Sequence, residues 1–412
     1  MIAPAVRHAE HGFQVTGYLS ECIAETAADL ARFPDTARVF LPGGKPLAKA
    51  ARLVQPDYAA TLRAIATDGP AALYGGALGR QVVEYMARAG GLITLDDLGR
   101  YRTVERAPVR GTYRGFEIAG CPPPTGGGIH LIQMLNVLEG LDVKALGYGT
   151  VDGFHLLAEV MKIAFADRNA ATGDPAFVNV PVARLIAKEY AMTRRAGIDM
   201  AKAAAYTAGV APESAHTTHV TVADGDANVV VATQTINNLF GAKAMVPGTG
   251  MLLNNTMALF DPHPGHTLSV APGKRMTSSM APTIVLRDGQ PLGAMGLPGG
   301  VRIFTSVLQA LVNAIDHEMT LQEAVEAPRI WTQGQELEVE AAVPAAVREG
   351  LAARGHRVVP VPHVAGGMAA VAFGPDSTVI GASCWRADGT PIGLGGGYAR
   401  EGIRFWPDAR RP

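Results

Sequence analysis

The chain has 412 residues, of which 48% are apolar and 18% are charged, and its formal net charge at pH 7 is −1. This composition excludes a disordered chain, and the length predicts two or three domains or one large layered domain. The balanced charge excludes general attraction to nucleic acid or to an anionic membrane. The three cysteines, Cys22, Cys121 and Cys384, are odd in number and form no CxxC pair, which argues against a disulfide framework and a thiolate metal site.

The first residues of the chain as given do not predict a secretion signal. Residues 1–13 contain no apolar core segment, and no long uncharged apolar span follows them. The chain as given is therefore expected to be cytoplasmic, with a periplasmic or secreted location as the alternative if its true start lies upstream. A P-loop, a GxGxxG motif after a strand, an HExxH motif and an EF-hand loop are all absent from the sequence, so we expect neither a cofactor nor a metal.

The first half of the chain is predicted to be mainly helical. Apolar residues recur at i, i+3 and i+4 in several stretches, and a capping signal at residues 94–97 precedes a short helix. Residues 108–119 alternate like a strand pair, and residues 121–128, Cys-Pro-Pro-Pro-Thr-Gly-Gly-Gly, form a loop that is first rigid and then flexible. The longer predicted helices are 18–30, 56–67, 79–89, 129–138 and 151–167.

The second half is predicted to be rich in strands. An alanine-rich stretch at residues 201–215 is typical of a linker, and β-prone segments divided by Gly, Asp and Pro follow it. Helices that cover a largely antiparallel core make an α+β layered fold the expected class. The predicted β-rich segments are 217–241, 251–257, 280–286 and 292–297, and the predicted helices are 302–315, 321–327 and 344–353.

A hairpin after the linker carries the strongest chemical signal. Residues 224–228, Asp-Gly-Asp-Ala-Asn, are a turn between two β-prone runs. A hairpin centred on Asp226 places Thr217 opposite Thr235, with Asn237 on the same face. Three small polar groups would then meet at one end of the hairpin, where a hydroxyl can be activated. Threonine is also simply β-prone, so this pattern alone leaves an ordinary strand as the alternative.

Motifs spread along the chain resemble those of the γ-glutamyltransferase family. They occur in the family's order and spacing and cover essentially all 412 residues. The matching segments in the first half are 3–7, 122–128, 155–159 and 164–168, and those in the second half are 217–222, 235–237, 252–255, 274–275, 278–283 and 296–300.

The resemblance implies an N-terminal nucleophile hydrolase with an αββα four-layer sandwich, made as an inactive precursor. The precursor would cut itself between His216 and Thr217 into a helical, large-subunit-like region, 1–216, and a catalytic, small-subunit-like region, 217–412. The freed Thr217 would carry a hydroxyl nucleophile and an α-amino base with a pKa near ~7.7–8.0.

The family's other site residues map onto further positions. Thr235 would orient the nucleophile, and we expect His219 to be a hairpin side chain and not part of a histidine triad. Gly299 and Gly300 would provide the backbone N–H groups of the oxyanion hole. The substrate's α-carboxylate would be bound by Ser278 and Ser279, and its α-amino end by Asn237.

Three departures from the family bear on the substrate. Leu259 stands where the family has an aspartate that pairs with the γ-glutamyl ammonium, and an unpaired buried charge costs about 3–5 kcal/mol. Asp261, two positions on, is a replacement only if the loop shifts. The family's N-terminal segment, with an arginine that binds the α-carboxylate, has no counterpart here, and residues 260–267 are too short for a lid.

Three functions are therefore open. The first is an autoprocessed, γ-glutamyltransferase-like amidohydrolase or acyltransferase that passes its acyl group to water or to an amine such as an amino acid or peptide. The second is an acylase-like enzyme for amides without an α-amino group, of the glutaryl or oxamate type. The third is an inactive, truncated homologue with a binding role. An active chain would be a heterodimer of its own two fragments, with or without higher assembly.

Overall fold

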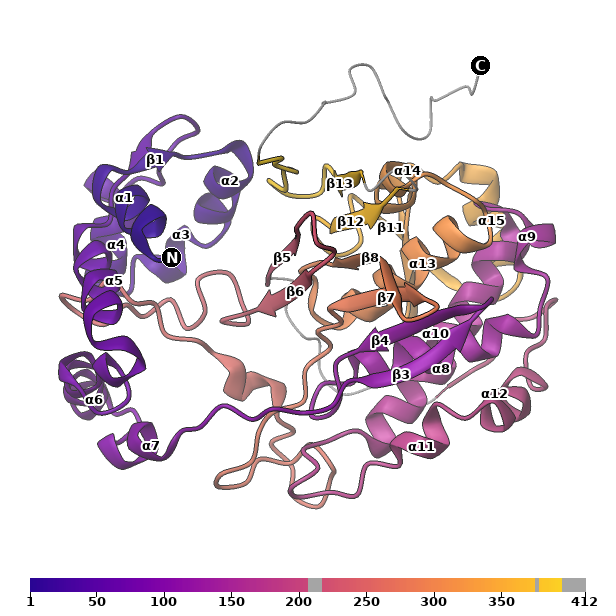
Figure 1. Cartoon of the computed structure of the whole chain (residues 1–412), viewed down its shortest axis with the longest axis horizontal. Helices are drawn as coiled ribbons and strands as arrows, with labels where there is room; N and C mark the ends of the chain where they lie inside the picture. The colour runs from indigo at the N-terminus through magenta and orange to yellow at the C-terminus, as the bar shows by residue number, and fades with distance from the viewer. Residues whose placement is uncertain (207–216, 375–377, 395–412) are drawn as a thin grey trace. The chain divides into compact units, whose positions relative to one another are not determined.

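The computed structural model describes residues 1–206, 217–374 and 378–394 (Figure 1). The chain forms two units: unit 1 comprises residues 1–106 and 236–255, and unit 2 comprises residues 107–235 and 256–412. Both predicted fragments contribute to both units. The predicted boundary between fragments at residues 216 and 217 is a covalent one, which the folding units do not test, and it stays a prediction.

Unit 1 is a group of short helices around a small apolar core. Ile23, Leu30 and Phe40 are buried in that core. The predicted helix 18–30 is divided into two, because the Thr26 side chain donates to the Cys22 carbonyl oxygen and Thr26 has a non-helical backbone. The capping signal at residues 94–97 is confirmed, since Thr94 and Asp97 form a reciprocal capping box. The helices are α1 (Ala3–His11), α2 (Gly17–Glu25), α3 (Ala27–Leu30), α4 (Pro34–Phe40), α5 (Pro56–Asp68), α6 (Ala77–Ala89) and α7 (Leu95–Arg100), and β1 (Phe13–Gln14) pairs with β2 (Arg52–Leu53).

Unit 2 is built on a six-stranded sheet in which every neighbouring pair is antiparallel. The predicted strand pair at residues 108–119 and the strands predicted at 280–286 and 292–297 are all found in it. The strand order is β13 (Val379–Ser383), β12 (Ala369–Phe373), β8 (Gln290–Gly296), β7 (Thr283–Arg287), β4 (Phe116–Gly120) and β3 (Val109–Tyr113).

Buried helices cover one face of this sheet, and a hairpin lies on the other (Figure 1). The side chain of Ile132 in α8 fills the space beside Gly111 of β3, where a Cβ atom would lie only 2.3 Å from it. On the opposite face, the ring of His219 fills the space beside Gly296. The helices are α8 (Gly127–Glu139), α10 (Val151–Ala171) and α13 (Ile303–Ile315), and the hairpin is β5 (Thr218–Ala223) with β6 (Val229–Gln234).

Shorter elements complete unit 2. The helices predicted at 321–327 and 344–353 are found as α14 and α15, and β10 pairs in parallel with β11 beside β9. Among the described residues, no helix combines the length and apolarity needed to cross a membrane. The remaining α-helices and β-strands are α9 (Val143–Leu146), α11 (Val182–Leu185), α12 (Lys188–Arg195), α14 (Leu321–Glu326), α15 (Ala345–Ala353), β9 (Ile330–Trp331), β10 (Glu336–Glu340) and β11 (Arg357–Val361).

The predicted β segment at residues 251–257 is wrong. Leu252 forms only an isolated bridge with Met245, and residues Thr256–Leu259 form a 3-10 helix, η3. The Oδ1 atom of Asn255 accepts a hydrogen bond from the backbone N–H of Asn238. Asparagine side chains that bind the backbone in this way compete with the ladder of a strand, and this is why β-propensity misleads here.

Candidate active site

The hairpin β5–β6 has the register that the sequence predicts. Thr218 pairs with Gln234 and Ala223 with Val229, so Thr217 and Thr235 lie opposite each other just beyond the ends of the strands. The Oγ1 atom of Thr217 lies 3.3 Å from that of Thr235 and donates to it. Two hydroxyl groups are thereby joined at the end of the hairpin where the nucleophile is predicted.

His219 fixes the hairpin on the sheet. The Thr221 hydroxyl donates to the Ala369 carbonyl oxygen at 3.1 Å and accepts from Nε2 of His219 at 2.9 Å, while Nδ1 accepts from the Thr233 hydroxyl at 2.7 Å. Burial lowers the pKa of His219 to about 4, so the ring is neutral near pH 7. A neutral ring with both nitrogens engaged supports the predicted structural role of His219 over a histidine triad.

This buried histidine predicts a particular acid response. The unfolded chain takes up a proton on His219 near pH 6.5, whereas the folded chain does so only near pH 4. Its contribution to stability is therefore complete above pH 6.5 and falls by up to about 1.4 kcal/mol per pH unit as the pH drops to 4. His219→Gln retains the hydrogen-bonding capacity and removes the titrating group. The free energy of unfolding of this variant should therefore fall less steeply between pH 6.5 and pH 4, by the contribution of one proton. Denaturant unfolding at pH 7 and pH 4.5 measures this, and parallel pH profiles for the two proteins would contradict it.

The predicted oxyanion residues follow strand β8. Gly299 has φ +154° and Gly300 has φ +57°, and a Cβ atom on Gly299 would lie 2.5 Å from the Cβ of Ala365. Both positions therefore favour glycine. Within the described residues 217–374, neither the Gly299 N–H nor the Gly300 N–H donates a hydrogen bond. Because the ring of His219 lies against Gly296, the start of the hairpin lies beside the strand end that leads into these glycines.

The paired serines are buried beside the loop at residues 121–128. Ser278 is 6% exposed and Ser279 is 1% exposed, and the Ser279 hydroxyl has no hydrogen-bond partner among the described residues. The Ser278 carbonyl oxygen accepts from the Gly126 N–H at 2.9 Å and from the Thr125 hydroxyl at 3.0 Å. The sequence predicted that this loop resembles a segment of the family but did not predict a role for it. Its contacts assign Thr125 to holding the serine segment in place.

The residues expected to determine donor choice differ in their surroundings. Leu259 ends the 3-10 helix η3 and is partly buried. The Oδ1 atom of Asp261 accepts from both the backbone N–H and the ring Nδ1 of His263, each at 2.9 Å. These bonds lower the pKa of Asp261 and tie one of its carboxylate oxygens to its own turn. Asn237 belongs to unit 1 with φ +75°, and its substrate-binding role stays a prediction.

A buried polar cluster holds the chain ahead of the predicted cleavage site. The Glu159 carboxylate accepts from the Ala204 N–H and from Nζ of Lys162, which also donates to the Ala204 carbonyl oxygen. His155 and His356 lie within 4.8 Å of Glu159 and share a hydrogen bond of 2.8 Å. The Lys162 ammonium supplies the counter-charge of Glu159, so these contacts account for the cluster without a metal ion. His216, which directly precedes the predicted cut, lies outside the described residues.

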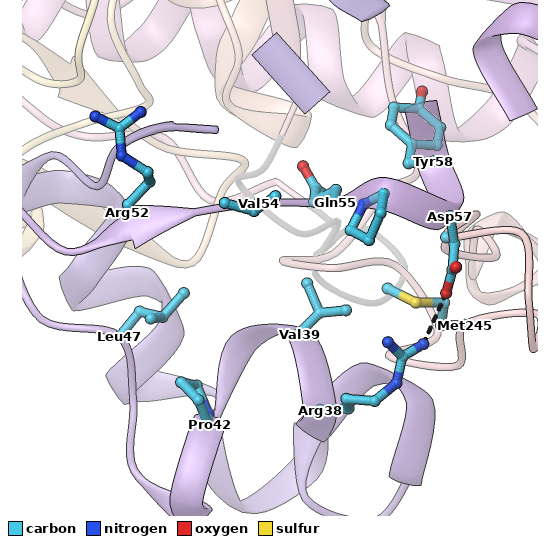
Figure 2. Close-up of a pocket in the computed structure, with 12 residues that line it drawn as sticks. Arg38, Val39, Pro42, Leu47, Arg52, Val54, Gln55, Asp57, Tyr58 and Met245 are labelled. Atoms are coloured by element: carbon cyan, nitrogen blue, oxygen red, sulfur yellow. Dashed lines mark hydrogen bonds and ion pairs between the residues drawn. The ribbon is translucent and has the colours of Figure 1, made fainter. Parts of the chain in front are cut away.

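A separate pocket of about 190 Å³ lies in unit 1 (Figure 2). Arg38 and Asp57 face each other there, with Nη2 of Arg38 2.7 Å from Oδ2 of Asp57. Leu47 and Met245 line its apolar part. None of the predicted catalytic or substrate-binding residues lines this pocket.

Three comparisons with known proteins agree with one another. The sequence model of the family described as Gamma-glutamyltranspeptidase matches residues 1–394. The Acylase ACY 1 proenzyme of Pseudomonas sp. (strain SE83) is 61% identical over 406 residues, which are 98% of this chain and 73% of the relative. The Glutathione hydrolase proenzyme of Escherichia coli (strain K12) is 39% identical over 401 residues, which are 93% of this chain and 69% of the relative. A solved cephalosporin acylase from Bacillus halodurans superposes with a TM-score of 0.88 at 29% identity, covering 96% of this chain and 74% of that structure. This likeness confirms the predicted α+β fold.

Proposed function

The chain belongs to the γ-glutamyltranspeptidase family, and we propose that it is an autoprocessed acylase whose nucleophile is Thr217. Membership confirms the resemblance predicted from the motifs and makes the chain an N-terminal nucleophile hydrolase. The observation that carries the proposal is the pair of hydroxyl groups of Thr217 and Thr235, 3.3 Å apart at the end of the hairpin.

The proposed reaction uses the two functional groups of an N-terminal threonine. The Oγ1 atom of Thr217 attacks the carbonyl carbon of an amide while the free α-amino group takes up the hydroxyl proton. The N–H groups of Gly299 and Gly300 bind the oxyanion, and each such donor contributes about 3 kcal/mol to the transition state. The proton passes to the departing amine, and water or an amine acceptor then attacks the acyl-enzyme.

Thr235 has a distinct role in this proposal. Its hydroxyl group shares a hydrogen bond with that of Thr217, and it can donate its own proton to Oγ1 when the Thr217 proton passes to the α-amino group. The Thr235 hydroxyl thereby sets the orientation of the nucleophile. Thr235→Ala is expected to lower kcat by about ten- to a hundredfold while KM changes little, because substrate binding does not use this hydroxyl. Steady-state kinetics of the cut protein measure both constants. A variant with wild-type kcat, or one whose only change is a higher KM, would remove Thr235 from this role.

The mature enzyme is proposed to be a heterodimer of residues 1–216 and 217–412. Strands β3 and β4 come from the first fragment, and β7, β8, β12 and β13 come from the second. Because β4 pairs with β7 inside one sheet, the cut would leave the two fragments joined by a shared core. Denaturing gels should therefore resolve two bands from a protein that elutes as one species under native conditions.

We propose donors that lack an α-amino group, as in the glutaryl or oxamate type. Leu259 provides no charge for a substrate ammonium, and one oxygen of the Asp261 carboxylate is bound to His263. The 61% identity to a protein named an acylase supports the same choice. Comparison of a glutaryl anilide with the γ-glutamyl anilide of equal length tests the proposal. The glutaryl donor should have the higher kcat/KM, whereas a strong preference for the γ-glutamyl donor would favour a glutathione hydrolase.

A further inference from the structure

A cluster of buried charges lies behind the loop that contains Gly299 and Gly300. Arg329, Glu340 and Arg386 are each at most 3% exposed. Arg386 forms a two-pronged ion pair with Glu340, with Nε 2.6 Å from Oε1 and Nη2 2.5 Å from Oε2. Burial lowers the pKa of Arg329 to about 10, so that its side chain is still charged at pH 7. The cluster therefore places two positive charges and one carboxylate inside unit 2.

Three hydrogen bonds of the cluster reach one short loop, residues 364–366, while Arg386 donates to the carbonyl oxygens at the end of α14, residues 325–327. Nη1 of Arg329 donates to the carbonyl oxygens of Val364 and Gly366, at 3.3 Å and 3.2 Å. Oε1 of Glu340 accepts from the Val364 N–H at 2.7 Å. Charged groups thus hold three backbone atoms of this loop, whose middle residue, Ala365, has φ +60°.

The same loop contacts the residues of the proposed oxyanion hole. The Gly366 N–H donates to the Pro298 carbonyl oxygen at 2.9 Å. The Ala365 Cβ packs so closely against Gly299 that a Cβ atom added to this glycine would lie only 2.5 Å from it. Gly366 thus connects the two regions, because its carbonyl oxygen accepts from Arg329 and its N–H donates to Pro298.

Stability alone does not explain such a cluster. Buried ion pairs lose hydration, and apolar side chains of similar volume often replace them without loss of stability. A guanidinium fork and a carboxylate do, however, fix the directions of backbone groups that apolar side chains leave free. An oxyanion hole needs such fixed directions, because donors must already point at the oxyanion when it forms.

We propose that Arg329, Glu340 and Arg386 are positioning residues for acyl transfer. Arg329 and Glu340 hold residues 364–366, and Arg386 holds the carboxylate of Glu340. The loop in turn holds Pro298 and Gly299 so that the N–H groups of Gly299 and Gly300 face the developing oxyanion. The inference rests on the proposed role of these two glycines. Loss of the cluster's geometry then weakens transition-state binding and leaves substrate binding intact, so kcat falls and KM does not change.

Arg329→Lys is the test, because lysine keeps the charge and loses the planar guanidinium. Nη1 of that group reaches two carbonyl oxygens of the loop while Nη2 is fixed on the Val325 carbonyl oxygen, and one ammonium group cannot reproduce both. The matched control is Arg114→Lys, in the turn between β3 and β4. Arg114 also binds a carboxylate, that of Asp316, and the carbonyl oxygens of Glu139 and Leu141. For both variants we would measure kcat and KM per mole of cut protein on one anilide donor, together with the thermal unfolding midpoint.

We expect Arg329→Lys to lower kcat on the order of a hundredfold with KM within about twofold, the loss typical of an impaired oxyanion donor. Arg114→Lys should keep wild-type kcat even if its unfolding midpoint falls equally. Equal kcat losses in the two variants, wild-type kcat in Arg329→Lys, or a change in KM alone would overturn the proposal. If Arg329→Lys does not fold, Ala365→Gly is the second variant, because it changes the same loop and leaves the buried charges untouched. It should likewise lower kcat with KM within about twofold.

A parallel variant separates this inference from the proposed oxyanion hole. Gly299→Ala places a methyl group against Ala365 and should itself lower kcat. If Gly299→Ala retains wild-type kcat, the oxyanion role fails and the inference fails with it. If Gly299→Ala loses activity and Arg329→Lys does not, the oxyanion role stands and only the positioning role is lost.

Discussion

Thr217→Ala is expected to leave a single uncut chain of 43.0 kDa with no amidase activity. The hydroxyl group of Thr217 is the proposed nucleophile both for cleavage of the bond that precedes it and for acyl transfer. Loss of the group removes the covalent route altogether, so activity should fall by at least about 10⁴-fold. A denaturing gel and an anilide assay measure the two effects on one preparation.

Thr217→Ser is the matched control, because serine keeps the hydroxyl group and loses only the methyl group. It should still be cut and should retain measurable activity. An active Thr217→Ala protein, or one cut into the wild-type fragments, would remove Thr217 from both roles. A wild-type chain that stays whole and inactive would instead favour the inactive homologue as the function.

Leu259→Asp is expected to shift donor preference toward the γ-glutamyl anilide by about 10- to 100-fold relative to the glutaryl anilide. The new carboxylate would pair with the substrate ammonium, and a charged hydrogen-bonded pair contributes a few kcal/mol when partly buried. Both donors present the same scissile amide to Thr217 and differ only in the amino group. The ratio of their kcat/KM values therefore isolates that one contact.

Leu259→Asn is the control for this swap, since asparagine has the size and polarity of aspartate without its charge. It should shift the ratio far less than Leu259→Asp. Equal shifts in the two variants would mean that polarity, and not charge, decides the donor. A wild-type preference for the γ-glutamyl donor that Asp261→Asn abolishes would identify Asp261 as the ammonium partner despite its bonds to His263.

The hairpin was fully predictable from the sequence because its information is local. The turn at residues 224–228 fixes the centre, and strand alternation then sets every pair, including Thr217 with Thr235. Helices with clear apolar periodicity, such as α6 and α13, were predicted for the same reason. The 3-10 helix η3 was not, because asparagine side chains next to it take up backbone partners that a strand would need.

The surroundings of the predicted site residues were not predictable from the sequence. Thr125 and Ser278 are joined by a hydrogen bond across 153 residues of chain. Arg329 reaches Gly366 across 37 residues and Glu340 reaches Val364 across 24. Strands β12 and β13, which follow those residues, have no strong alternation and were not anticipated. Such contacts depend on how the strands assemble, which composition and periodicity do not specify.

The most direct test of the account is mass spectrometry of the smaller fragment of the wild-type protein. The protein would be quenched with acid during turnover of a glutaryl anilide. We expect the fragment to begin Thr-Thr-His-Val, at Thr217, and part of it to carry one additional glutaryl group on its first residue. A fragment that begins at another residue, or an acyl group found on any residue other than Thr217, would contradict the assignment of Thr217 as the nucleophile.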